Sequence, residues 1–102
     1  MEVLNPQPLR NYLQVRAKIH HLNRDMVLFY AHQIPMTAAW LHSGTIRINF
    51  EMKLAKDKTA TGLYFLDELS QQKYVTFSAK ILAGARIWLI TRSEIEPFLL
   101  TV

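Results

Sequence analysis

Apolar and polar residues alternate strictly in two stretches of the chain, residues 45–51 and residues 74–81. A period of two is typical of a β-strand with one buried face. The apolar positions of the two stretches are Ile46, Ile48, Phe50, Val75, Phe77, Ala79 and Ile81. A shorter alternation of Val15, Ala17 and Ile19 with polar residues predicts a third strand over residues 15–19.

Turn signals separate these stretches from further apolar runs. We expect strands over residues 26–30, 38–42 and 86–90, bounded by turns at residues 22–25, at Ser43-Gly44 and at Gly84. Residues 53–59 are polar and predict an exposed loop. Many short strands of this kind predict a mainly β fold: a jelly-roll-like β-roll, or double-stranded β-helix.

Three short helices are expected beside the strands. Pro8 is suited to the first turn of a helix over residues 9–13. A helical turn is predicted around Asp67, and Ser93 with Glu96 has the spacing of a capping box that opens a third helix. Pro97 cannot donate the next helical hydrogen bond, so this last helix should span only a turn or two.

Composition narrows the class of protein. The chain has 102 residues, half of them hydrophobic, which predicts one folded domain over residues 1–102. No stretch is long and apolar enough to span a bilayer, and the N-terminus lacks the pattern of a secretory signal, so we expect a cytoplasmic protein with no membrane partner. The absence of cysteine excludes disulfides and thiolate chemistry. The net charge of +4 is scattered along the chain, which favours a solvated surface over a nucleic-acid groove.

The order and spacing of these parts carry a family resemblance. Val27-Leu28-Phe29 is followed by an irregular stretch with His32, then by Trp40-Leu41-His42-Ser43-Gly44, and the last strand ends in Leu89-Ile90-Thr91-Arg92 before a helix start. From about Leu9 to Leu99 the chain resembles the cyclic-nucleotide-binding superfamily, the sensor module of bacterial regulators of the catabolite activator and Fnr type. The resemblance implies the β-roll. The family's regulators continue into a long helix and a DNA-binding domain, and we expect no DNA-binding domain here.

The phosphate-binding cassette of that family is where the sequence departs from the pattern. The resemblance implies an opening Gly-Glu that holds the ribose and, about ten positions on, an arginine that pairs with the cyclic phosphate. Gly62 fits the glycine, but Leu63 replaces the glutamate, and Gln72 and Lys73 occupy the arginine's place. Lysine lacks the bidentate fork of arginine. If a cyclic nucleotide or another small anionic effector still binds, the candidate residues are Gly62, Leu63, Tyr64, Gln72, Lys73 and Tyr74.

Other chemistry has weaker support. His20 and His21 are adjacent, which on a strand sends the two rings to opposite faces, and neither His32 nor His42 has a carboxylate at metal-ligand spacing. A metal-dependent, cupin-like enzyme therefore remains only a third alternative. No serine lies in a nucleophile-elbow context. We expect no catalytic residue, no metal and no cofactor beyond a possible cyclic-nucleotide effector.

An interaction surface is predicted from the aromatic residues. Core packing is favoured for Trp40, Phe65 and Phe77. Trp88 shares a strand face with Arg86 and Ile90, and that face, together with Tyr74, is predicted to be exposed. These observations favour a non-catalytic regulatory module with a degenerate nucleotide pocket, which binds a protein partner or forms a homodimer. The alternative is a sensor that still binds a small anion.

Overall fold

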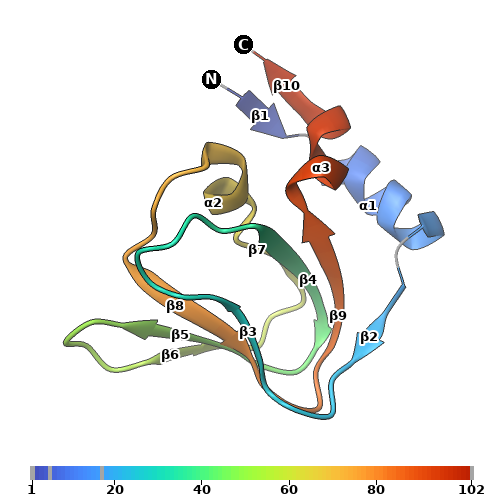
Figure 1. Cartoon of the computed structure of the whole chain (residues 1–102). Coiled ribbons are helices and arrows are strands. Elements are labelled where there is room, and N and C mark those ends of the chain that lie inside the picture. Colours follow the sequence, from blue (N-terminus) through green and yellow to red (C-terminus); the bar gives the residue numbers. More distant parts are fainter. Residues whose placement is uncertain (1, 5, 17, 102) are drawn as a thin grey trace.

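The computed structural model describes residues 2–4, 6–16 and 18–101. The elements in chain order are β1 (Glu2–Leu4), α1 (Pro6–Arg16), β2 (His20–His21), β3 (Met26–Phe29), β4 (Thr37–Ser43), β5 (Ile46–Phe50), β6 (Lys56–Lys58), β7 (Gly62–Tyr64), α2 (Leu66–Gln71), β8 (Phe77–Ile81), β9 (Arg86–Thr91), α3 (Arg92–Ile95), a 3₁₀ turn (Glu96–Phe98) and β10 (Leu99–Thr101). Figure 1 shows their arrangement.

Two four-stranded sheets form the body of the molecule. One has the strand order β2-β9-β4-β7 and the other β3-β8-β5-β6, and the strand pairs in both are antiparallel. β1 and β10 form a separate antiparallel pair near the two chain ends (Figure 1). The predicted mainly β double-sheet roll is confirmed.

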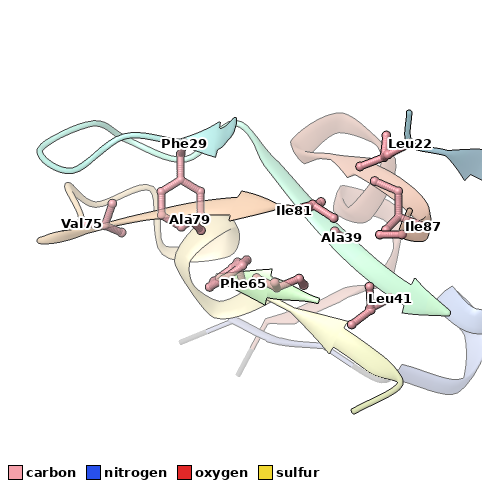
Figure 2. Packing of buried hydrophobic residues seen from close by; sticks show 11 residues of the cluster. Leu22, Phe29, Ala39, Leu41, Phe65, Val75, Ala79, Ile81 and Ile87 are labelled. Atoms are coloured by element: carbon pink, nitrogen blue, oxygen red, sulfur yellow. The ribbon is translucent and has the colours of Figure 1, made fainter. Parts of the chain in front are cut away.

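The main core lies between the two sheets. Leu41 and Ile87 come from the first sheet and Ile46 and Ile81 from the second, and all four are fully buried. Figure 2 shows Leu41 and Ile87 of the first sheet and Ile81 of the second in this interior, together with Phe29 and Phe65. The strict alternation of β5 and β8 produces this core, because every second side chain faces the opposite sheet.

A second cluster covers the outer face of the first sheet. Trp88 and Ile90 of β9 pack there with Leu13 of α1, Leu69 of α2 and Ile95 of α3. The three short helices therefore lie against this face (Figure 1), and β9 is buried on both sides. Burial on both faces explains why Ile87-Trp88-Leu89-Ile90 is a continuous apolar run instead of an alternating one.

Most predicted elements are found in place. The strands over residues 26–30, 38–42, 45–51 and 86–90 correspond to β3, β4, β5 and β9, and the second alternating stretch contains β8. The turn around Asp67 is α2, and Pro8 lies in the first turn of α1. The helix before Pro97 spans a single turn, as expected.

Three local predictions are wrong. Residues 15 and 16 belong to α1, not to a strand, and Val15 is exposed; Ala17 lies outside the described residues. The capping box is made by Thr91 and Glu94, two residues before the predicted pair, because Thr91 Oγ1 accepts from the Glu94 amide and Glu94 accepts in return from the Thr91 amide. The exposed segment 53–59 includes a short strand, β6, which pairs with β5.

Candidate functional site

The first three candidate residues form β7, where they point to different sides of the sheet. Leu63 pairs with Trp40 and packs in the outer cluster, whereas Tyr64 pairs with Ala39 and packs against the core between the sheets. The Tyr64 hydroxyl donates to the Ala60 carbonyl at 2.6 Å. Gly62 lies within the strand, four residues before α2 begins. β7 thus contributes apolar packing on both of its faces.

Phe65 is the residue that joins β7 to α2. Its backbone is left-handed, with φ of 68°, and as the N-cap of a six-residue helix it has no side-chain capping bond. A non-glycine residue in this conformation is held there by its surroundings. Here the surroundings are the core, because only 9% of the residue is exposed.

An aromatic cluster occupies the space between the sheets next to the start of α2. The Phe65 ring meets Phe29 edge-on with centroids 5.1 Å apart and lies 6.1 Å from Phe77. Phe29 and Phe77 are themselves 5.5 Å apart. Figure 2 shows Phe29 and Phe65 directed into this interior. No polar or charged side chain among the described residues is buried there or elsewhere. The buried side chains of this interior are therefore apolar.

The remaining candidates, Gln72, Lys73 and Tyr74, follow α2 and are all exposed. Gln72 is the C-cap of the helix, with φ of 53°. Val75, which follows Tyr74, is buried. Its carbonyl accepts from the His32 amide at 2.6 Å and its amide donates to the Gln33 carbonyl at 3.1 Å, which connects this segment to the loop between β3 and β4. The structure thus places the six candidates in two groups, a packed strand and an exposed loop.

A cavity that the sequence reasoning missed lies beside α2. It measures about 280 Å³ and is lined by Ile34, Pro35, Met36, Leu69, Gln72 and Arg92. The guanidinium of Arg92 donates to the Ser70 carbonyl at 2.8 Å and lies 3.8 Å from Glu96. The one signal for it in the sequence is the apolar Ile34-Pro35-Met36 within an otherwise irregular stretch.

The predicted interaction surface is only partly exposed. Tyr74 is 74% exposed, and Arg86 is also exposed. The prediction that Trp88 and Ile90 are exposed is wrong, because both are buried under the helices. Alternation correctly places Arg86, Trp88 and Ile90 on one face, but α1 and α3 cover the part of that face nearer the end of β9.

The histidines lie in three different surroundings. His20 and His21 are exposed in β2, and His32 Nε2 is 2.6 Å from a carboxylate oxygen of Glu51. The ring of His42 packs edge-on against Trp88 with centroids 4.2 Å apart. Burial, with a smaller contribution from the charge of Arg86, lowers the pKa of His42. Within residues 2–4, 6–16 and 18–101, no three histidine or acidic side chains come together in an arrangement suited to a metal ion.

The turn between β5 and β6 exposes Met52 and Leu54 almost completely; Leu54 belongs to the segment 53–59 predicted to be exposed, and Met52 directly precedes that segment. No helix in the described part of the chain is long and apolar enough to cross a membrane.

Comparison with known proteins supports the fold. No protein-family model matches the sequence, and no curated protein matches it. Among solved structures, the chain is similar to the catabolite activator protein of Thermus thermophilus, with a TM-score of 0.66 and 10% identity over 90% of this chain and 46% of that one. It therefore spans about half the length of that protein.

Two further structures are similar. One comes from a cyclic-GMP-dependent signalling pathway that regulates bacterial phytopathogenesis, with a TM-score of 0.67 and 12% identity over 93% of this chain and 79% of that one. The other is a cAMP-binding acyltransferase from Mycobacterium smegmatis in its E234A form, with a TM-score of 0.60 and 11% identity over 87% of this chain and 28% of that one. The predicted resemblance is confirmed at the level of the fold: the chain has the β-roll of a cyclic-nucleotide-binding-like domain.

Proposed function

We propose that this chain is a non-catalytic regulatory module whose roll serves as a scaffold for binding a protein partner or a second copy of itself. The observation that carries the proposal is the neutral, aromatic interior next to α2. Phe65, Phe29 and Phe77 fill the space between the sheets, and no charged side chain of the described residues is buried beside them. A buried phosphate without a pairing charge is strongly disfavoured.

The energetic consequence follows from the missing contacts. Each charge-assisted hydrogen bond contributes roughly 1.5–3 kcal/mol, and micromolar affinity corresponds to about 8 kcal/mol in total. Losing both an arginine pair and a glutamate contact brings a micromolar site to the millimolar range. Lys73 is exposed and offers a point charge at the surface, which supports only weak binding of a phosphate.

The absence of catalysis is part of the proposal, and the surroundings of the one adjacent His-Ser pair support it. His42 and Ser43 are neighbours in the chain, but the His42 ring packs against Trp88 and its Nε2 has no hydrogen-bond partner among the described residues. A general base must reach the proton that it removes. The His42 ring packs against Trp88, and no hydrogen bond from its Nε2 to Ser43 is formed.

Thermal-shift titration with cAMP, cGMP and cyclic di-GMP tests the proposal. A ligand at one hundred times its Kd stabilises the folded state by about 2.7 kcal/mol, which raises Tm by roughly ten degrees or more for a domain of this size. We expect no saturable shift at millimolar ligand. Sedimentation velocity over a range of protein concentrations then separates self-association from a requirement for another protein. A saturable shift with a Kd below about 10 µM would overturn the scaffold role.

A small-anion sensor is the second candidate, and the cavity beside α2 is the observation that favours it. Gln72 and Arg92 line an otherwise apolar space of about 280 Å³, just below the usual size of ligand pockets. If an anionic effector binds through Lys73, Lys73→Ala abolishes the thermal shift. The control variant Lys58→Ala, which removes an exposed lysine of β6, leaves the shift intact. If Arg92 carries the effector, Arg92→Gln abolishes the shift and Lys73→Ala does not.

A further inference from the structure

The hairpin of β5 and β6 carries an apolar tip on the outside of the molecule. Its strands pair from Ile46 opposite Lys58 to Ile48 opposite Lys56, and residues 51–55 form the turn beyond them. Figure 1 shows this hairpin projecting away from the body of the roll. Met52 is 103% exposed and Leu54 is 90% exposed. Two large apolar side chains at the end of a projection do not contribute to the stability of the fold, which points to a contact outside it.

The charges around the tip have one predominant sign. Lys53, Lys56 and Lys58 are exposed along the same hairpin. Asp57 accepts two hydrogen bonds from the cationic Arg47, at 2.8 and 3.0 Å, and Glu51 lies 2.6 Å from His32 Nε2. With Asp57 offset by Arg47, three lysines face the single charge of Glu51, so the potential at the tip is positive.

The backbone and the base of the hairpin hold this arrangement. Met52 has a left-handed backbone with φ of 56°, which closes the turn and holds the apolar residues at its end. Lys56 lies over the ring of Phe50, 5.8 Å from its centroid, so the cation is positioned by packing against the hairpin itself. The tip thus combines apolar side chains in front with cations behind them.

We propose that residues 51–58 form a docking tip for the surface of an anionic lipid bilayer, with Met52 and Leu54 entering the headgroup region and Lys53, Lys56 and Lys58 contacting the lipid charges. A fluid bilayer accepts a convex apolar projection without a matching pocket, whereas a protein partner needs a concave site of fitted shape. Lysine stems extend along apolar surface while their charges remain in water. Surface docking needs no spanning helix, so it revises only the expectation that no membrane takes part. It is independent of the role of the roll's interior.

Vesicle co-sedimentation of the full chain provides the first test. The probes are vesicles of phosphatidylcholine alone and vesicles with about 30 mol% phosphatidylserine. We expect binding to the anionic vesicles only, lost as ionic strength rises from about 0.05 to about 0.5 M. Met52→Ser with Leu54→Ser should weaken binding about tenfold or more. The control, Val15→Ser, removes an apolar side chain that is 80% exposed elsewhere and should leave binding unchanged.

A fluorescent label at the tip tests whether the tip itself enters the bilayer. The chain has no cysteine, so Met52→Cys carries a single environment-sensitive fluorophore, with Tyr74→Cys as the control position. A blue shift on anionic vesicles at position 52 and none at position 74 supports the proposal. Absence of binding at about 1 mM lipid overturns it. It also fails if the Met52/Leu54 double variant binds like the wild type, or if binding occurs with no change at position 52.

Discussion

Phe65 offers a direct test of how the interior of the roll is held. Its ring is buried among Phe29 and Phe77, while its backbone has a φ of 68° that disfavours any side chain. The packing of the side chain and the strain of the backbone therefore oppose each other at one residue. Phe65→Ala removes the packing and keeps the strain, whereas Phe65→Gly removes both.

The magnitudes decide the order of the two variants. Truncating a buried phenylalanine to alanine costs about 3–5 kcal/mol. A left-handed backbone costs an alanine about 1–2 kcal/mol, and glycine avoids that cost but loses about 0.5–1 kcal/mol through its greater freedom in the unfolded chain. Phe65→Gly should therefore be more stable than Phe65→Ala by up to about 1.5 kcal/mol, and by about 0.75 kcal/mol at the midpoints of the two ranges. This order is the reverse of what an ordinary strand position gives.

Phe77 supplies the matched control. It belongs to the same aromatic cluster but lies in β8 with an ordinary strand backbone, so Phe77→Gly should be less stable than Phe77→Ala. Urea unfolding followed by tryptophan fluorescence gives the four midpoints. The reasoning is refuted if glycine is the worse substitution at both positions, because the left-handed backbone of Phe65 would then carry no strain.

Three other predictions address the turns, a helix start and a histidine. In urea unfolding, Gly44→Ala should destabilise the fold about 1–3 kcal/mol more than Gly84→Ala. Both glycines have a positive φ, but only at Gly44 would an added Cβ come within 2.6 Å of the Ala85 backbone. Equal losses of stability would contradict this clash. Thr91→Ala should cost about 1 kcal/mol of unfolding free energy and Ser93→Ala almost nothing, because Thr91 is the capping residue; a larger effect at position 93 would place the cap there. An NMR titration should show the pKa of His42 below 6.5. Because the unfolded chain then binds more protons than the folded one as pH falls through 6.5, the free energy of unfolding should decrease with falling pH. His42→Gln should reduce this decrease, and an unchanged pH dependence would contradict the assignment.

The strand pattern could be predicted because one face of most strands is dry. In β5 and β8 every second residue faces the other sheet, so the period of two in the sequence is the geometry of the core itself. The turns at Gly44 and Gly84 were equally visible, since both positions need a positive φ. Spacing along the chain then sufficed to predict the double-sheet roll.

What covers a face could not be predicted from that face alone. Alternation places Trp88 and Ile90 together, but whether solvent or a helix lies above them depends on α1, which begins more than seventy residues earlier in the chain. The same helix explains the misread segment after Leu13. Val15 alternates with polar residues, yet the burial of Leu13 against β9 extends the helix through this stretch, a case of tertiary packing overriding a weak local pattern.

The candidate site also depends on packing that the sequence alone does not reveal. The sequence shows Leu63, Gln72 and Lys73 at the positions that the resemblance compares with a glutamate and an arginine, but the left-handed backbone of Phe65 and the place of its ring between the sheets are visible only in three dimensions. A pocket can lose its ligand by losing charges or by being filled, and the two differ in consequence. Lost charges leave a space that a neutral ligand can occupy, whereas a filled interior also stabilises the fold through the area that it buries. We propose that the Phe29, Phe65 and Phe77 contacts make this chain an example of the second case, and we expect that introducing a glutamate or an arginine at the surface does not by itself give nucleotide binding.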